Sequence, residues 1–259
     1  MDSIQKLKAL MASDQPDELR RGLALLREEI PRAGSAQARP LFDLLTSLFY
    51  VDPLDRPDLV PVVDEALGVL AGFGPWVIPL LVERLDAGDL KAQMAVAHAL
   101  GRMGAAAVEP LVEAYRKAPD DDRRAFALYA LGMIQSPAAG VAAPLALEAA
   151  RSSDLELRDT ATRAIGRLAE HVPPGAFGEA VRAGLFAALC TNAADENAGV
   201  RAKAVRSLTA LGHRGHLRAE ERATVRALCL RILGREERFE WDLAYVVRRE
   251  AEAALRLLE

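Results

Sequence analysis

The chain has 259 residues, a length that is long for one globular core but ordinary for a repeat protein. Hydrophobic residues make up 51% of it and aromatic residues only 5%, which argues against global disorder and against a β-sandwich. The formal net charge of −4 disfavours a protein built to neutralise nucleic-acid phosphates, and the two cysteines form no disulfide framework, which predicts a reducing compartment.

The N-terminal part of the chain has amphipathic helical patterns but lacks the repeat found further along. Apolar residues at helical spacing predict helices over residues 4–11, 19–30 and 40–50, followed by a turn over 51–57. A terminal unit of a stack must hide the face that has no neighbour, so we expect 1–39 to be an N-terminal cap.

The sequence predicts neither a secretory signal nor a membrane anchor. Residues 1–6 lack a basic start followed by an apolar run. The longest uncharged stretch, 66–82, is short for a membrane span and is interrupted by glycines and prolines. We therefore expect a cytoplasmic protein that binds no membrane.

The tripeptide Ala-Leu-Gly recurs along the middle of the chain. It stands at 66–68, 99–101 and 130–132, and as Ala-Ile-Gly at 164–166, with steps of 33, 31 and 34 residues. A period of this size is typical of stacked supersecondary units, none of which can bury its apolar face alone.

Each repeat predicts two helices joined by a short turn. In residues 74–104, Pro75 and Pro79 suit the first turn of one helix. Asp89 suits the N-cap of a second helix, which Gly104 ends. The corresponding pairs in the next two units are Pro110 with Asp120 and Pro144 with Asp154.

Two longer units follow, over 173–212 and 214–258, and we expect 213–259 to form a C-terminal capping unit. An aromatic cluster is expected to seal this last unit, and it consists of Phe239, Trp241 and Tyr245. The predicted fold is all-α: one right-handed α–α superhelix of stacked antiparallel helix pairs over 1–259.

The second helix of these units resembles the HEAT repeats, particularly the bacterial subgroup named after phycobilisome lyases. In that family the helix has Asp, three residues, Arg, two residues, Ala-Ala, one residue and Ala-Leu-Gly. The residues that follow this pattern are Asp120, Arg124, Ala127, Ala130, Leu131 and Gly132, then Asp154, Arg158, Ala161, Ala164, Ile165 and Gly166. The match covers about residues 40–258 and departs in places, with Gln93 replacing the arginine and Thr209 the glycine.

The resemblance implies an architecture more than a function, because the fold hosts scaffolds, adaptors, lyases and glycosylases. Within the family, aspartates and arginines form a ladder between neighbouring repeats. A structural role is thereby implied for Asp120, Arg124, Asp154, Arg158 and Arg201.

Catalytic and cofactor motifs are absent from the sequence. There is no Gly-x-x-x-x-Gly-Lys loop, no Gly-x-Ser-x-Gly elbow, no His-Glu-x-x-His and no Cys-x-x-Cys. His213 and His216 flank Gly215, which favours an exposed turn over a metal site. The aspartates at 120–122 suit a helix start. We assign no catalytic, cofactor-binding or metal-binding residue, and the sequence favours a protein that is not an enzyme.

The helical period places one row of side chains on the predicted inner face. Counted from the arginine position of each second helix, positions +3, +7 and +10 face the core, and +1, +2, +5 and +9 face away from the first helices. The candidate partner-binding residues in this row are His98, Arg102, Phe126, Tyr129, Met133, Arg163, Arg167, Lys203 and Arg206.

Asp159 is the one acid expected in this row. Aromatic, methionine and arginine side chains are typical of protein interfaces. Phe126 and Tyr129 could equally fill space between repeats, and the sequence leaves both interpretations open.

These features predict a non-enzymatic scaffold or adaptor that binds an acidic or extended protein segment on its concave face. Two alternatives stay open on the family resemblance. One is a HEAT-like bilin lyase or chromophore-handling protein, and the other is a DNA-binding relative of HEAT-like glycosylases, although the net charge makes nucleic acid the weaker partner. The sequence does not predict an oligomeric state.

Overall fold

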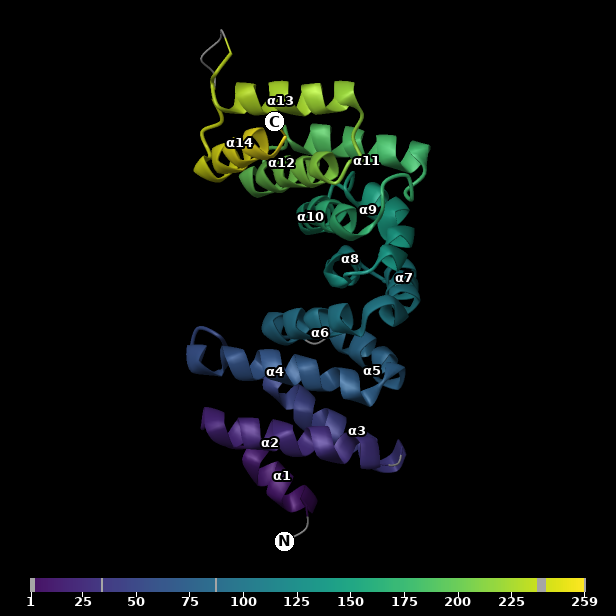
Figure 1. The fold of residues 1–259 in the computed structure, drawn as a ribbon, viewed down its shortest axis with the longest axis vertical. Helices are drawn as coiled ribbons and strands as arrows, with labels where there is room; N and C mark the ends of the chain where they lie inside the picture. Colours follow the sequence, from purple (N-terminus) through teal and green to yellow (C-terminus); the bar gives the residue numbers. More distant parts are fainter. Residues whose placement is uncertain (1–2, 34, 87, 237–240, 259) are drawn as a thin grey trace. The chain divides into compact units, whose positions relative to one another are not determined.

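The computed structural model describes residues 3–33, 35–86, 88–236 and 241–258 (Figure 1). Regular structure in these residues consists of α-helices and short 3₁₀ helices, and the β pairing seen there is an isolated bridge between Leu233 and Trp241. The prediction of an all-α fold is confirmed.

Two compact units divide the chain, Met1–Pro110 and Leu111–Glu259, and each is described by itself. The predicted single solenoid over 1–259, with caps at 1–39 and 213–259, stays a prediction.

The first unit begins with helices that match the expected segments. They are α1 (Ser3–Met11), α2 (Pro16–Glu29), α3 (Ser35–Thr46), α4 (Val60–Leu70), α5 (Ile78–Glu83) and α6 (Leu90–Met103). Short 3₁₀ helices link them at Ile30–Arg32, Ser47–Tyr50, Pro57–Leu59, Ala71–Phe73, Pro75–Val77, Arg84–Asp86 and Gly104–Ala107. Helix α4 packs between α2 and α6, and its buried side includes Val62, Leu67 and Leu70 (Figure 1).

The second unit is a two-layer stack of helix pairs. Its helices are α7 (Val108–Lys117), which starts at the end of the first unit, α8 (Asp121–Met133), α9 (Ala143–Ala149), α10 (Leu155–His171), α11 (Glu179–Asn192), α12 (Ala198–His213), α13 (Ala219–Ile232) and α14 (Tyr245–Leu257), with a 3₁₀ helix at Pro137–Ala142. Helices α8, α10, α12 and α14 pack consecutively in one layer, while α9, α11 and α13 each pack against the helix that follows them (Figure 1).

Side-chain caps begin the second helices as predicted. Asp89, Asp120 and Asp154 each accept a hydrogen bond from the backbone N–H three residues further on. Asn197 accepts from the second and third residues after it, and each such cap stabilises a helix by about 1 kcal/mol. Ala244 stands at the start of α14 without a side-chain cap.

The predicted aromatic seal of the last unit is not formed as expected. Phe239 lies outside the described residues, whereas Trp241 is 57% and Tyr245 68% exposed. The Arg248 guanidinium lies 4.4 Å from the centroid of the Trp241 ring, so this aromatic side chain covers an arginine instead of a core.

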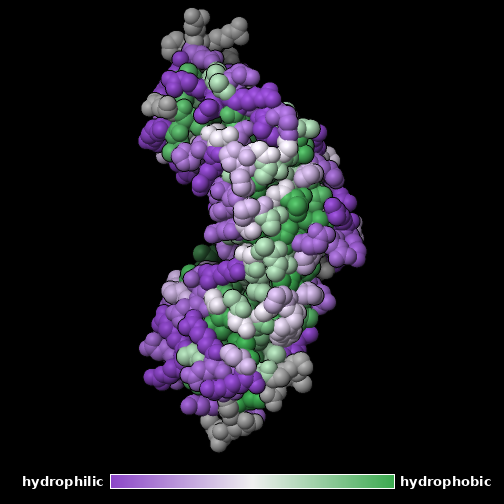
Figure 2. All heavy atoms as spheres, turned by 45° about the vertical axis from the view of Figure 1, so that its right-hand side comes forward, coloured by the Kyte–Doolittle hydropathy of each residue, from purple (hydrophilic) through white to green (hydrophobic). Residues whose placement is uncertain are grey.

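Small residues contribute to the surface. On the face drawn in Figure 2, hydrophilic side chains flank a paler area of intermediate to hydrophobic residues. Exposed alanines of the 3₁₀ turns include Ala105, Ala106 and Ala138.

Cys190 and Cys229 are both free thiols, and burial raises the pKa of Cys229 to about 11, so it stays protonated at neutral pH.

Among the described helices, none is by itself long and apolar enough to cross a membrane. One bent pair, Pro57–Phe73 with Pro75–Glu83, meets the length and composition criteria together, with a 110° angle between its halves.

Helices α10 and α12 approach each other closely at a glycine. A Cβ at Gly166 of α10 would lie 2.5 Å from the hydroxyl oxygen and 3.0 Å from Cα of Ser207 in α12. A Cβ at Gly132 of α8 would lie 3.5 Å from Cα of Ala164, which is ordinary van der Waals contact. The α8–α10 contact therefore has room for a methyl group, and the α10–α12 contact does not.

Replacing each glycine by alanine tests this difference. We expect Gly166→Ala to destabilise the protein by roughly 1–3 kcal/mol, because the methyl group overpacks the contact. We expect Gly132→Ala to be neutral or to stabilise it by up to about 1 kcal/mol, because alanine favours helix. Urea unfolding followed by circular dichroism measures both, and equal losses in the two variants would contradict the close approach.

Candidate functional site

The predicted core positions of the second helices are confirmed in the second unit, whereas two residues at the predicted surface position +1, Ala125 and Ala202, are buried. The +3 and +7 residues are all buried, and they are Ala127, Leu131, Ala161, Ile165, Ala204, Leu208, Ala251 and Leu255. The candidate residues of the row are half-buried or exposed on the same helices. The helical period therefore identified the core side chains and most of those that reach the surface.

An aromatic patch lies on α8. Phe126, Tyr129 and Met133 are half-buried, so each packs on the protein and still presents surface. The Arg163 guanidinium of α10 lies 5.4 Å from the centroid of the Tyr129 ring, within the range of a cation–π interaction. The aromatic patch on α8 therefore lies next to a basic side chain of α10.

Four predicted basic residues line one hollow between α10 and α12, of about 120 Å³. Arg163 and Arg167 come from α10, while Lys203 and Arg206 come from α12. They reach the same hollow because the helices are held close together at Gly166, which lies in its wall.

The expectation of a single acid in this region was wrong. Lys203 forms an ion pair with Asp159, as the sequence allowed, but Arg206 binds Glu250 of α14 through Nε at 3.0 Å and Nη2 at 2.6 Å. Arg167 lies 3.4 Å from Glu170. Glu250 stands two residues after Arg248, which is the +2 position of α14. The rule that predicted the surface row on the earlier second helices would therefore have found it.

The pairing of Arg206 with Glu250 fixes their charges. Hydrogen bonds from Arg206 outweigh the effect of burial and lower the pKa of Glu250, and the same contact raises the pKa of Arg206. Both groups are therefore ionised at neutral pH, and the net positive charge of the face is smaller than the sequence predicted.

A second hollow, of about 210 Å³, continues from the first along α12 towards α14. The two share Glu170, Arg206 and Ala210. The second is also lined by His213, Glu250 and Leu257. Together they form a succession of recesses across three helices of one layer.

His98 and Arg102 belong to the first unit, whereas the other seven candidate residues belong to the second. His98 lines a separate hollow of about 240 Å³, together with apolar residues that include Phe49, Val63, Leu67 and Met94. Arg102 donates hydrogen bonds to the backbone oxygen and the carboxylate of Asp64. This hollow is mainly apolar, which the sequence did not predict.

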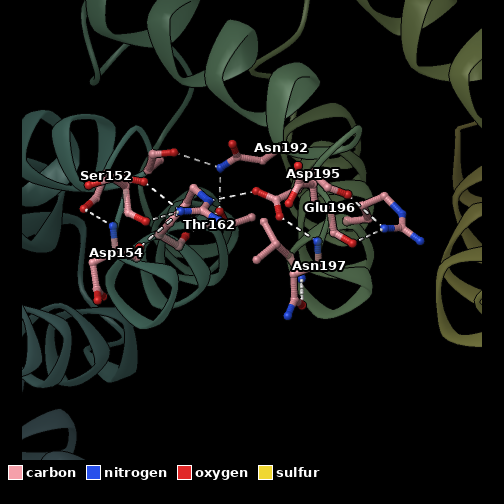
Figure 3. A network of polar contacts seen from close by, with 12 residues as sticks. Ser152, Asp154, Thr162, Asn192, Asp195, Glu196 and Asn197 are labelled. Carbon is pink, nitrogen blue, oxygen red and sulfur yellow. Dashed lines mark hydrogen bonds and ion pairs between the residues drawn. The ribbon is translucent and has the colours of Figure 1, made fainter.

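Two of the three arginines implied by the family ladder, Arg158 and Arg201, link repeats, but to other acids than expected. Figure 3 shows the loops around Asp154 and Asp195 that take part in this network. Asp120 and Asp154 cap their own helices. Arg158 instead binds Asp195 through Nε at 2.8 Å, and Arg201 binds Asp242 with two bonds of 2.6 and 2.9 Å. Each rung therefore joins an arginine to the loop that precedes the next second helix.

These loop aspartates also fold their own loops. Asp195 accepts a hydrogen bond from the N–H of Asn197, and Asp242 accepts one from the N–H of Ala244. In the preceding loop, the Ser152 hydroxyl oxygen accepts from the N–H of Asp154 in the same way. Sequence reasoning missed Asp195 and Asp242, although their place two residues before the N-cap of the next second helix is a shared signal.

The ladder lacks its rung at Arg124. The equivalent loop position holds Ser152, and Arg124 bonds Asp121 of its own helix at 3.2 Å. Its Nε is buried and has no hydrogen-bond partner among the described residues. An unsatisfied buried donor costs about 1–3 kcal/mol, so this position is a weak point of the stack.

Replacing Ser152 by aspartate should complete the ladder. We expect Ser152→Asp to stabilise the protein by about 1 kcal/mol, because a carboxylate there keeps the turn and can pair with Arg124. Urea unfolding measures the gain. The control is the same substitution in an Arg124→Met background, where the gain should vanish, and an undiminished gain would contradict the inferred rung.

The ladder aspartates also make stability depend on pH. Burial by itself would raise the pKa of Asp195 and Asp242, but hydrogen bonds from Arg158 and Arg201 and from backbone N–H groups bring the pKa of both below the ordinary value. Their contribution to folding is therefore complete above the ordinary aspartate pKa of about 3.9, and it is lost as the pH falls from there through the lower folded value.

Acid titration of unfolding tests this assignment. We expect the free energy of unfolding to fall steeply below about pH 4, and Asp195→Asn to lower stability at neutral pH while flattening that fall. Urea midpoints measured between pH 7 and pH 2 give both quantities. A variant with the wild-type slope would show that the acid sensitivity arises elsewhere.

The two histidines of the sequence pair, His213 and His216, differ in their exposure to solvent. His213 is exposed, whereas His216 is buried, its Nε2 lies 3.2 Å from the backbone oxygen of Ala169, and its ring lies 4.9 Å from that of Phe177. Within the described ranges, no group of three or more histidine, cysteine, aspartate or glutamate side chains could hold a metal ion. The aspartates at 120–122 lie at the start of α8, as expected.

Comparisons with known proteins agree with this architecture. The family model described as HEAT repeats matches residues 61–132. Among curated proteins, no sequence matches this chain.

Solved structures with a similar fold come from different proteins. A chain from the complex of CpcE and CpcF of phycocyanin lyase from Nostoc sp. PCC7120 has a TM-score of 0.56 and 19% identity, covering 70% of this chain and 98% of that one. An engineered protein has a TM-score of 0.55 and 18% identity, covering 100% and 97%. A chain from a structure of Kap95p with RanGDP has a TM-score of 0.63 and 15% identity, covering 98% of this chain and 35% of that one.

The protein is thus of the helical-repeat class, built from stacked helix pairs that present a surface instead of a single deep pocket. Within this class, residues 61–132 match the family model described as HEAT repeats, and the rest of the chain shares the fold of helical-repeat structures.

Proposed function

We propose that the protein is a non-enzymatic scaffold that binds an extended, acidic protein segment along the layer of α8, α10, α12 and α14. The observation that carries the proposal is the succession of recesses on this layer. The aromatic patch on α8 is followed by the basic hollow between α10 and α12 and then by the hollow towards α14.

The chemistry of these recesses suits an extended chain. Phe126, Tyr129 and Met133 offer half-buried apolar surface of the kind that anchors interfaces. The arginines and Lys203 next to them can orient carboxylates. The two hollows share Arg206 and Ala210, so a segment that leaves one enters the other.

The same contacts make duplex nucleic acid a poor occupant. Four cations in one small hollow, three of them paired with Asp159, Glu170 or Glu250, can engage one charged group, whereas duplex DNA is bound through many phosphate contacts along a basic surface. Similarity to a phycocyanin lyase subunit is a likeness of fold, and it assigns no bilin-binding residue. A protein segment therefore fits the face better than DNA, and chromophore handling has no residue to support it.

Site-specific photo-cross-linking tests the proposal. A photo-reactive phenylalanine analogue replaces Ala210, which both hollows share, and the matched control replaces Ala187, which is exposed on α11 in the other layer. In native extract, we expect position 210 and not position 187 to capture a segment rich in aspartate and glutamate, identified by mass spectrometry. Arg163→Glu with Arg167→Glu should reduce its yield at least tenfold, because two attractive charges become repulsive. Equal capture at 210 and 187, or a yield that the double variant leaves unchanged, would contradict binding on this face.

A further inference from the structure

The hollow between α10 and α12 has the composition of an anion site. Its charged lining consists of four cations, Arg163, Arg167, Lys203 and Arg206, and one acid, Glu170. At about 120 Å³ it is much smaller than pockets for drug-sized ligands, which measure about 300–1,000 Å³. It therefore suits one small charged group and not a whole ligand.

The cations keep hydrogen-bond donors for such a group. A guanidinium carries five N–H donors and an ammonium three. Within the described part of the chain, Glu250 takes Nε and Nη2 of Arg206, and Glu170 lies against Nη1 of Arg167. In the same part of the chain, Arg206 Nη1 and Arg167 Nε and Nη2 form no hydrogen bond, and both residues line the hollow.

The acids that pair with the cations hold them in place. The Asp159 and Glu250 side chains are only 18% and 11% exposed, whereas that of Arg206 is 55% exposed. The two buried carboxylates thus hold Lys203 and Arg206, while much of the Arg206 side chain stays open to solvent. Side chains that are already ordered lose less entropy when they bind, so this arrangement favours affinity.

The charge and donor count fit a phosphate monoester better than a carboxylate. A carboxylate brings one charge and two oxygens, whereas a phosphate monoester brings about −1.5 to −2 charges and three strong acceptor oxygens. The larger charge and acceptor set engages more donors from the two helices and better offsets the repulsion of Glu170. We infer that this hollow binds the phosphate group of a phosphorylated serine or threonine in the bound segment.

This inference rests on the proposed function, because the hollow lies within the succession of recesses that the segment follows. The neighbouring hollow along α12 and the aromatic patch on α8 give room for residues on both sides of the modified one. The phosphate would thus fix the register of a segment whose other contacts tolerate many sequences.

Fluorescence polarisation with peptide libraries tests the inference on the full chain. The probes are three labelled degenerate libraries that differ only at the central residue, which is phosphoserine, serine or glutamate. We expect the phosphoserine library to bind at least tenfold more tightly than the glutamate library, and the serine library to bind more weakly still. Millimolar inorganic phosphate should compete with the phosphoserine library on the unmodified protein, and added salt should weaken binding.

Paired variants locate the site. Arg163→Gln with Arg167→Gln should weaken phosphoserine-library binding at least tenfold. Arg222→Gln with Arg226→Gln removes the same charge from exposed positions of α13 and should leave binding unchanged. Thermal unfolding of both variants confirms that they fold, and the phosphate competition needs no variant at all.

The outcomes separate this inference from the proposed function. Equal affinity for the phosphoserine and glutamate libraries, or wild-type affinity in the Arg163–Arg167 variant, overturns the phosphate site. The scaffold proposal survives either result if cross-linking at position 210 still captures an acidic segment. If inorganic phosphate competes but no segment cross-links, the scaffold proposal fails, and the inference of a phosphorylated segment fails with it.

Discussion

The close approach of α10 and α12 is the constraint on which the candidate site depends. Gly166 has no side chain, so Ser207 of the next helix can lie where a Cβ would otherwise be. Two basic residues from each helix are then brought to one hollow. A larger residue at 166 would separate the helices, and the same four side chains would become unrelated surface charges.

Ion pairs between repeats then determine how that surface behaves. Asp195 and Asp242 hold the arginines of preceding helices, whereas Asp159 and Glu250 hold the cations of the exposed face. Most of these carboxylates are largely buried, so breaking a pair leaves a charge that water solvates poorly. The stack and the face are thus stabilised by the same kind of contact, which joins a helix to a loop in the ladder and two neighbouring helices on the face.

A repeat architecture explains why the candidate site is a series of recesses. Each helix pair adds one more helix to the layer of α8, α10, α12 and α14, and each gap between helices adds one recess. Variation at a few exposed positions changes the character of each recess without changing the fold. The aromatic patch on α8 and the basic hollow beside it differ for this reason.

The sequence alone determined the features that depend on near neighbours in the chain. The all-α fold, the caps at Asp89, Asp120, Asp154 and Asn197 and the buried and exposed positions of each second helix follow from local hydrogen bonding and a period of 3.6 residues. The tertiary structure decided which charges meet. Glu250 pairs with Arg206 across 44 residues, and Asp195 with Arg158 across 37, because the packing of successive repeats sets those distances and the spacing along the chain does not.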